Sequence, residues 1–370
     1  CAELTRAVHD AGIDVETPVC GLDTAFAATL QSANYDPHKH RTIAILSEYD
    51  ALPGIGHGCG HNVIAAAGLG AFLALADTLR KTPDAFSGRI IYLGTPAEES
   101  DAGKENMARA GAFDTADAAI MVHPYFIDVA DQAWLGRREC RVTYCGISAH
   151  ASSYPFMGRN ALDAAALAYQ GLGLLRQQLP VSDRIHAIID NGGQTPNLIP
   201  QTASLHINIR SRYAPTLRAL SHRIEDVLHG AALMAGVQAD IHWDSSPMTM
   251  PVRSNQTLGQ RWVLAQREIG RNPYPAGTIS DTLAASTDFG NISLRLPGIH
   301  PLIQIAPEGT GLHTAEFAAA AQSPRAEEAA LDGAYGLALD FLTDDALAAD
   351  VQAEFEKAGG AVQVQTYFDS

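Results

Sequence analysis

The sequence has few basic side chains and no long apolar run. Its 370 residues include 25 Lys or Arg and 41 Asp or Glu, which gives a net charge of −16. It contains no basic run that could neutralise a phosphate backbone, so we expect neither nucleic acid nor an anionic membrane as a partner. The longest uncharged apolar stretch, 62–76, contains glycines and is shorter than the roughly 20 residues that cross a bilayer. We therefore expect no transmembrane helix.

Cysteine is also scarce, with only five residues, at positions 1, 20, 59, 140 and 145. An odd and sparse set in a chain of this length argues against a disulfide framework and favours a reducing compartment. We therefore expect a cytoplasmic protein. The sequence begins at Cys1 without a methionine, inside a stretch typical of a helix, so we also expect a segment to precede it.

The composition and the length predict two globular domains. Hydrophobic residues make up 46% of the chain and charged residues 18%, and the length exceeds what one hydrophobic core usually serves. Between positions 42 and 122 short apolar runs alternate with helical stretches, which is typical of an α/β fold whose mixed, mostly parallel sheet carries helices on both faces. The apolar runs are 42–46, 89–93 and 118–122, and the helical stretches are 62–81 and 104–113.

The pattern changes near Arg137. From there the sequence predicts a strand, a helix at 160–179, two strands, a helix at 215–235 and a last strand. This β-α-β-β-α-β order is typical of a ferredoxin-like unit. We therefore predict an inserted α+β domain over 134–246 and a discontinuous first domain made of 1–133 and 247–370.

Potential metal ligands stand just beyond the predicted strands of the first domain. In an open α/β sheet, ligands bind in the crevice beyond the carboxyl ends of the strands, so side chains from separate loops can converge there. Cysteine, histidine and carboxylate together suit zinc, cobalt or manganese better than calcium or magnesium. The residues are His57, Cys59 and His61 after the first run, Glu98 and Glu99 after the second, His123 after the third, and His313 after a later run at 301–306.

Each of these residues has an ordinary structural explanation when it is taken alone. A histidine at a strand end is more often structural than a ligand, Cys59 alone would be a small buried apolar residue, and two adjacent glutamates would form a solvated loop. Their joint placement favours a hydrolytic metal site, in which one glutamate binds metal and the other is the general base. A cysteine hydrolase with Cys59 as nucleophile and a nearby histidine as base stays open as an alternative.

Six ordered motifs resemble those of metallopeptidase family twenty, the aminoacylase and carboxypeptidase-type di-metal amidohydrolases. They extend over nearly the whole chain, and the Cys-Gly-His-Asn form resembles the branch of p-aminobenzoyl-glutamate hydrolases and aminoacylase-like dipeptidases. The resemblance implies a zinc-exopeptidase-like catalytic domain and an inserted lid and dimerisation domain. The motifs are SEYDALPGIGHGCGHN (47–62), GTPAEES (94–100), MVHP (121–124), GISAHAS with GRNALDA (146–164), GGQTPNLIP (192–200) and HTAEF (313–317).

The resemblance also implies two divalent metal ions per chain, zinc or manganese, with cobalt as a third candidate. Cys59 would bridge the two ions, His61 and His123 would complete one site, and Glu99 and His313 would complete the other.

Three neighbouring residues would support these ligands. Glu98 would be the general base, and Asp50 would orient a ligand. The chain has Glu48 where relatives with a His-x-Asp pair have histidine. His61 would substitute for that histidine, and the role of Glu48 stays open.

In the inserted domain the resemblance assigns three further residues. His150 would reach across a homodimer into the site of the other subunit and stabilise the oxyanion, while Asn197 and Arg210 would hold the carboxylate end of the substrate. Without the resemblance, His150 would be a structural histidine and Arg210 a surface ion-pair partner. The loop 286–288 is a weaker candidate for contact with substrate.

The predicted function is metal-dependent hydrolysis of the amide bond in small N-acyl amino acids or dipeptides. Two alternatives in other classes stay open beside the cysteine hydrolase. One is a carboxypeptidase-type exopeptidase that acts on longer peptides. The other is a non-catalytic metal-binding dimeric protein, which would be expected to have lost Glu98 or a ligand, whereas all of them are present.

Overall fold

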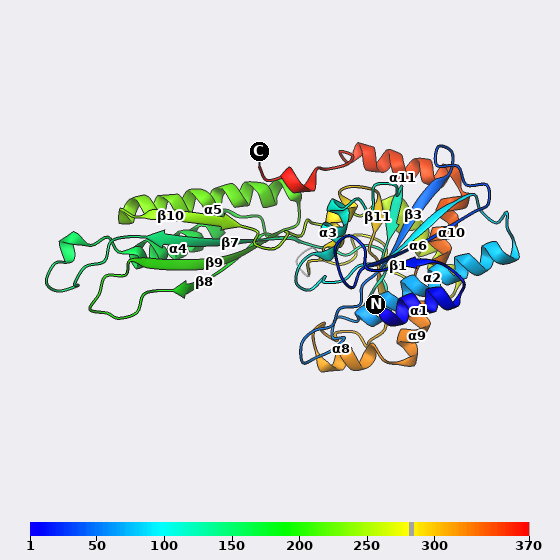
Figure 1. Cartoon of the computed structure of the whole chain (residues 1–370), viewed down its shortest axis with the longest axis horizontal. Helices are drawn as coiled ribbons and strands as arrows, with labels where there is room; N and C mark the ends of the chain where they lie inside the picture. The colour runs from blue at the N-terminus through cyan, green and yellow to red at the C-terminus, as the bar shows by residue number, and fades with distance from the viewer. Residues whose placement is uncertain (281–284, 370) are drawn as a thin grey trace. The chain divides into compact units, whose positions relative to one another are not determined.

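The computed structural model describes residues 1–280 and 285–369, which form two compact units (Figure 1). The first unit consists of Cys1–Ala133 and Val252–Thr366, and the second of Trp134–Pro251 with the last residues from Tyr367 onward. The second boundary lies five residues beyond the predicted one, because the backbone N–H of Arg137 donates to Thr249 O at 2.7 Å and Thr249 N–H donates back at 3.1 Å. Tyr367 also belongs to the second unit, where the Arg218 guanidinium lies over its ring at 4.9 Å.

The first unit is built on a mixed sheet whose order is β1-β2-β4-β3-β5-β11 among the described residues. The four strands from β4 to β11 run parallel, and β1 and β2 extend the sheet antiparallel at one edge. Six of the seven residues of β3 are buried, and successive residues point to opposite faces, so both faces of the sheet are covered. The strands are β1 (Val15–Glu16), β2 (Phe26–Gln31), β3 (Arg41–Ser47), β4 (Gly88–Gly94), β5 (Ala118–Ile120) and β11 (Gly298–Ile299).

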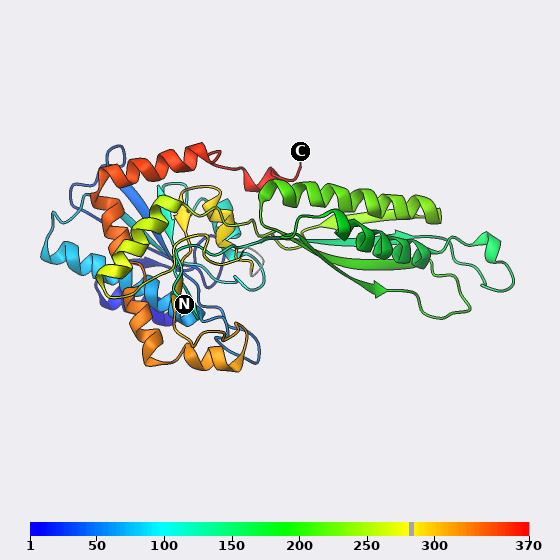
Figure 2. The same cartoon turned by 180° about the vertical axis from the view of Figure 1, so that it is seen from behind.

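Helices and a short second sheet complete the first unit (Figure 2). α2 and α10 pack against β3 and against each other, whereas α3 packs on α7, which contacts β11. The two-stranded parallel sheet consists of β6 (His123–Tyr125) and β12 (Leu302–Gln304). The helices are α1 (Ala2–Asp10), α2 (His61–Lys81), α3 (Gly103–Arg109), α6 (Gln256–Glu268), α7 (Phe289–Ser293), α8 (Ala315–Ala320), α9 (Pro324–Asp332), α10 (Tyr335–Thr343) and α11 (Asp345–Lys357).

Among the described helices, α2 is the one whose length and apolar composition would suffice to cross a membrane. It is longer than the apolar stretch 62–76 because its last turns also include Asp77, Arg80 and Lys81. Phe72 and Leu75 of this helix are fully buried in the core of the first unit, and α2 packs on β3 and α9. These contacts are those of a core helix.

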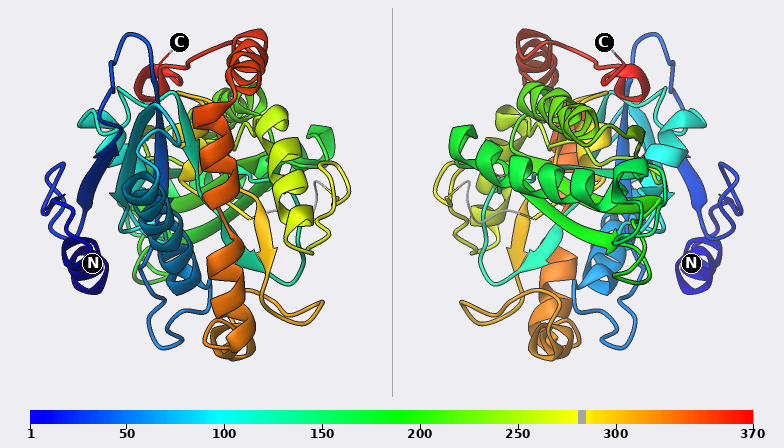
Figure 3. Two further views of the ribbon diagram at one scale, coloured as in Figure 1. Left: turned by 90° about the vertical axis from the view of Figure 1, so that its right-hand side faces the viewer. Right: turned by 90° about the vertical axis from the view of Figure 1, so that its left-hand side faces the viewer.

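The second unit has the order of elements predicted from the sequence. Its four strands are antiparallel in the order β10-β7-β9-β8, and α4 and α5 contact each other and the central strands, so both helices cover one face (Figure 3). Alternate residues of β9 are buried against them, including Leu205 and Ile207. This is the arrangement of a ferredoxin-like unit. The elements are β7 (Gly136–Cys145), α4 (Ala161–Leu175), β8 (Arg184–Asn191), β9 (Thr202–Ser211), α5 (Ala214–Ala235) and β10 (Gln238–Trp243).

Candidate metal centre

The loops that follow parallel strands of the first unit bring the predicted ligands together. Since β3 and β4 run parallel, the residues after them leave the sheet at the same edge. The candidates come from five segments of the chain. Glu48 and Asp50 follow β3, Glu98 and Glu99 follow β4, His123 opens β6, His61 opens α2 two residues after Cys59, and His313 precedes α8.

Two glycines allow these loops to approach closely. Gly60 has φ +80°, and a Cβ there would lie 2.5 Å from Pro124 Cγ, next to His123. A Cβ on Gly58 would lie 2.8 Å from Ile55 Cγ2, and the carbonyl of Gly58 accepts a hydrogen bond of 2.8 Å from His313 N–H. Glycine on both sides of Cys59 is therefore what lets its loop pack against the segments that carry His123 and His313.

Two non-glycine residues at the site have left-handed backbone. Ala97, directly before Glu98, has φ +63°, and His313 itself has φ +61°. This conformation costs roughly 1–2 kcal/mol for an L-residue. Such strain concentrates at functional sites, where the surrounding structure holds the residue in place.

The candidate ligand atoms form two groups that share Cys59. In the first group one ligand atom each of Cys59, His61 and His123 lies within 4.8 Å of the others, and Cys59 Sγ is 3.6 Å from His123 Nε2. In the second group the same limit holds for Cys59, Glu99 and His313, with Glu99 Oε1 3.4 Å from His313 Nε2. The five predicted ligands therefore lie together, with the thiol common to both groups.

Backbone and carboxylate acceptors orient the two buried histidines. His61 Nδ1 donates to Asp50 O at 2.9 Å and lies 3.2 Å from Asp50 Oδ1, while Asp50 Oδ2 accepts from Glu99 N–H at 3.0 Å. His123 Nδ1 donates to Pro124 O at 2.7 Å. In both rings a hydrogen bond to Nδ1 turns Nε2 toward the ligand group, as metal-binding histidines require.

Two buried polar atoms at the site fit a bound cation. Among the described residues, His61 Nε2 and Glu99 Oε1 have no hydrogen-bond partner. Buried polar groups without partners are rare, and an ion is one recognised explanation for them. Because the donors are a thiol, imidazoles and a carboxylate, the residues fit a divalent ion of the zinc class.

Without a cation, the electrostatics of the site favour the protonated forms of Cys59 and His61 and the deprotonated forms of Asp50 and His123. Burial raises the pKa of the Cys59 thiol to about 12. Burial alone would lower the pKa of His61, but its interactions with Asp50, Cys59 and Glu48 outweigh burial, so the pKa is raised well above its usual value. Burial would raise the pKa of Asp50, yet its hydrogen bond with His61 and the charge of that ring hold it at about 2.

Glu98 lies beside the ligand atoms. Its Oε2 is 3.8 Å from His61 Nε2, and it forms a third close group with His61 and Glu48. Burial and the negative charges of Glu48 and Asp288 raise the pKa of Glu98 well above that of a free carboxyl group. A carboxyl group with a raised pKa at this position is suited to accepting a proton and returning it.

Behind Glu98 lies a charged cluster that the sequence does not reveal. Lys104, Glu48 and Asp288 are at most 1% exposed. The Lys104 Nζ donates to Glu48 Oε1 and, at 2.6 Å, to Asp288 Oδ1. In the sequence Lys104 only marks the start of a predicted helix, and Asp288 belongs to a loop that is a weak candidate for substrate contact. Neither residue stands in a pattern that would distinguish it from a solvated charge.

The structure places the other three predicted residues in the second unit. His150 is exposed, and its Nδ1 accepts from Ser152 N–H at 3.3 Å. The Asn197 carbonyl accepts from Ala151 N–H at 3.0 Å, so His150 and Asn197 lie on neighbouring segments. Arg210 lies on β9 opposite Arg137.

Arg210 has an unusual environment for a guanidinium. Burial and the charge of Arg137 lower its pKa, the charge of Glu139 acts in the opposite direction, and the guanidinium makes no hydrogen bond or ion pair among the described residues.

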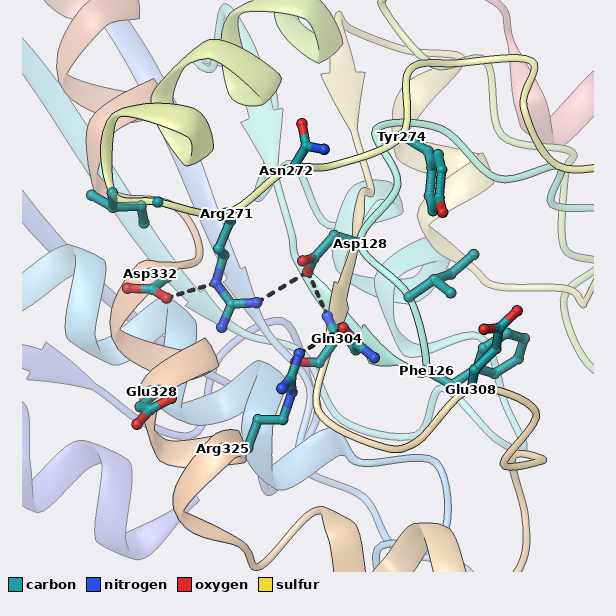
Figure 4. A pocket seen from close by; sticks show the side chains of 13 residues that line it. Phe126, Asp128, Arg271, Asn272, Tyr274, Gln304, Glu308, Arg325, Glu328 and Asp332 are labelled. Carbon is teal, nitrogen blue, oxygen red and sulfur yellow. Dashed lines mark hydrogen bonds and ion pairs between the residues drawn. The ribbon is translucent and has the colours of Figure 1, made fainter.

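A cavity of about 610 Å³ also occurs in the first unit, but no predicted ligand lines it (Figure 4). Arg271 lies between Asp332 and Asp128, at 2.7 and 3.1 Å, and Arg325 donates to Gln304 Oε1 at 2.6 Å. The two ion pairs of Arg271 join the segment after β6 to α9, and the hydrogen bond of Arg325 joins the end of β12 to α9. The cavity walls are therefore held together by structural interactions.

Comparison with known proteins agrees with this geometry. Residues 44–342 match peptidase family M20/M25/M40. The chain is 37% identical over 343 residues to a mouse (Mus musculus) Xaa-Arg dipeptidase, covering 92% of this chain and 79% of the relative. It is 27% identical over 426 aligned positions to one component of the p-aminobenzoyl-glutamate hydrolase of Escherichia coli, covering 96% and 87% of the two chains. The fold resembles that of a dinuclear metal-binding M20 peptidase from Bacillus subtilis, with a TM-score of 0.67, 19% identity and coverage of 92% and 91%.

The fold, the ligand groups and these matches define a metal-dependent hydrolase of amide bonds. The chain belongs to peptidase family M20/M25/M40. The predicted family, the α/β fold class and the hydrolase class are thereby confirmed, and the alternative of a non-catalytic protein is set aside.

Proposed function

We propose that the protein hydrolyses the amide bond of small N-acyl amino acids or dipeptides at a centre of two divalent ions. The observation that carries this proposal is the pair of ligand groups sharing Cys59. His61 and His123 would complete one ion site, and Glu99 and His313 the other. Zinc or manganese suits this donor set, and cobalt is a third candidate. The similar Bacillus subtilis protein, which is described as a dinuclear metal-binding peptidase, supports the count of two.

The residues around the ligands would have separate roles in the reaction, proton transfer for Glu98 and ligand orientation for Asp50. When bound, divalent ions lower the pKa of water and polarise a carbonyl oxygen. Glu98 would accept the proton of the attacking water and then pass it to the leaving amine, so that the amide bond is replaced by a carboxylate and an amine. Asp50, through its hydrogen bond to His61 Nδ1, would keep His61 Nε2 turned toward the metal.

Two residues of the second unit would hold the substrate carboxylate. The relatives are named for Xaa-Arg dipeptides and for p-aminobenzoyl-glutamate, which both end in an amino acid with a free carboxylate. The partly buried guanidinium of Arg210 is suited to that group, with Asn197 as a second contact.

The second unit would also form a homodimer, in which His150 stabilises the oxyanion in the site of the other subunit. The exposed side chain of His150 and the open edge strand β8 support this arrangement. Ile188 and Ile189 on that strand are 59% and 41% exposed. An apolar edge of this kind is stabilised when a second strand or subunit covers it.

We also propose that the protein works in the cytoplasm. All five of its cysteines are free thiols in the structure. This agrees with a reducing compartment.

Metal content tests the proposed function. After reconstitution with zinc and removal of loosely bound ions, the protein should retain close to two ions per chain. Cys59→Ala should lose most of both ions, because this thiol belongs to both ligand groups. Cys140→Ala is the matched control, since Cys140 is also buried but lies in the second unit. Full retention of both ions by Cys59→Ala would contradict the proposed centre.

A length series of substrates tests the choice of bond. N-acyl amino acids and dipeptides should be hydrolysed, and turnover should fall as the peptide lengthens. Equal or faster turnover of longer peptides would favour the carboxypeptidase-type alternative.

A further inference from the structure

Three buried charges lie directly behind the candidate metal ligands. Lys104 and Asp288 are fully buried and Glu48 is 1% exposed. Asp288 holds Lys104 at two points, because Oδ1 accepts from Nζ at 2.6 Å and Oδ2 accepts from the backbone N–H at 2.9 Å. Apolar residues of similar size often replace buried ion pairs without loss of stability. Stability alone therefore does not explain why the ammonium of Lys104 is buried with the carboxylates of Glu48 and Asp288.

Glu48 connects this cluster to the metal centre. Its Oε1 accepts from Lys104 Nζ, and its Oε2 lies 3.5 Å from His61 Nε2, the atom that would bind metal. The Asp50 carboxylate lies 3.2 Å from Nδ1 of the same ring. Both nitrogens of His61 thus face carboxylates from the segment after β3.

A carboxylate at this distance could itself bind the ion held by His61. One ligand atom each of Glu48, His61 and Glu98 lies within 4.8 Å of the others. A catalytic metal must keep one coordination position open for water or substrate. An added Glu48 ligand would close that position unless another group holds the carboxylate back. Lys104 is in place to do so, through a charge-assisted hydrogen bond.

We propose that Lys104, fixed by Asp288, is a positioning residue that holds Glu48 against the His61 ring and away from the coordination sphere of the metal. The inference rests on the proposed metal centre. It assigns a role to Glu48, the position at which this chain departs from the His-x-Asp relatives.

A second buried ionic cluster also joins α3 to α7 and the residues after it, and it provides a control. Glu105, fully buried in α3, accepts from Arg295 at 2.8 and 3.0 Å and from Asn291 at 2.9 Å. It has no hydrogen bond or ion pair with a predicted ligand in the described part of the chain. Glu105→Gln should therefore lower the stability of the α3–α7 contact and leave the metal centre unchanged.

The test compares cobalt-loaded wild-type protein with Lys104→Met, Glu48→Gln, the double variant of these two, and Glu105→Gln. The visible absorption of bound cobalt reports its ligands, and kcat, KM, cobalt affinity and Tm are measured beside it. Lys104→Met should shift the cobalt bands and lower kcat at least about tenfold, with a smaller change in KM. In the double variant the carboxylate of Glu48, which Lys104→Met alone would release, is absent. Its kcat should therefore be higher than that of Lys104→Met, and the effects of the two substitutions should not add.

The outcomes separate positioning from a general structural role. Glu105→Gln should lower Tm with unchanged bands and kcat. If Glu105→Gln changes the cobalt bands and kcat as much as Lys104→Met does, the proposal is overturned. The proposal is also overturned if Lys104→Met leaves the cobalt bands and kcat unchanged. Should Lys104→Met fail to fold, Asp288→Asn loosens Lys104 without removing it, and unchanged cobalt bands in that variant overturn the proposal as well. A wild-type protein that binds no cobalt would instead refute the metal centre itself, and the positioning role with it.

Discussion

Replacing Gly60 by alanine would test how tightly the loop that carries Cys59 and His61 is built. The residue has φ +80°, which costs an L-residue roughly 1–2 kcal/mol. The added Cβ would lie 2.5 Å from Pro124 Cγ and 3.1 Å from Phe317 Cε1, and overpacking of this kind costs about 1–3 kcal/mol. The two terms together predict a loss of about 2–5 kcal/mol in the free energy of unfolding.

Gly70, inside the helix α2 that begins directly after Gly60, is the matched control. It has no positive φ, and the nearest atom to an added Cβ is Ala330 O at 3.7 Å, an ordinary contact. Gly70→Ala should therefore stabilise the protein by about 0.5–1 kcal/mol, since alanine loses less backbone entropy in a helix.

Urea denaturation of the two metal-free variants measures the difference directly. The midpoint of Gly60→Ala should fall well below that of wild type, and the midpoint of Gly70→Ala should rise slightly. Gly60→Ala should also lose zinc affinity, because Pro124, against which its Cβ would press, directly follows His123. Equal midpoints for the two variants would refute the close approach of these loops.

Three further outcomes follow from individual side chains. Glu98→Gln should keep its metal but lose about 10²–10⁴-fold in kcat, and retained turnover would remove Glu98 as the base. Arg210→Ala should raise KM about 10–100-fold for substrates with a free carboxylate, whereas Arg141→Ala on the same sheet, an ion-pair partner of Asp190, should not. The pKa of Asp50 is about 2 in the folded chain against an ordinary 3.8, so its contribution to stability is present above pH 4 and lost as pH falls toward 2. Metal-free Asp50→Asn should therefore be about 2 kcal/mol less stable at pH 7 and should show a weaker acid dependence in a pH series of urea titrations.

The predictable part of the site lies in short segments that each follow a strand. Cys59, Glu99 and His123 could be assigned because each follows an apolar run, and parallel strands carry such residues to one edge. The Glu98–Glu99 pair could be predicted to lie at the site for the same reason, since its position after the apolar run of β4 is visible in the sequence.

The parts that were missed depend on contacts between distant segments. Lys104 and Asp288 are 184 positions apart, and neither lies in a sequence pattern that predicts a buried side chain. The domain boundary was placed at 246 because the strand pattern ends there, while the pairing of Arg137 with Thr249 that extends the second unit is a tertiary contact.

At four residues of the site the pKa shifts favour the protonated form when no metal ion is bound. Burial raises the pKa of Cys59, of Glu48 and, together with neighbouring carboxylates, of Glu98, and the partners of His61 raise its pKa against the effect of burial. All four shifts favour the protonated form, because burial disfavours the thiolate and the carboxylates, and the acidic partners of His61 favour its charged ring. A divalent ion supplies positive charge and favours the deprotonated ligands, so binding must release protons and affinity must rise with pH. Zinc added to the metal-free protein in weak buffer should therefore acidify the solution, and less so for Cys59→Ala; uptake of zinc without proton release would contradict this account.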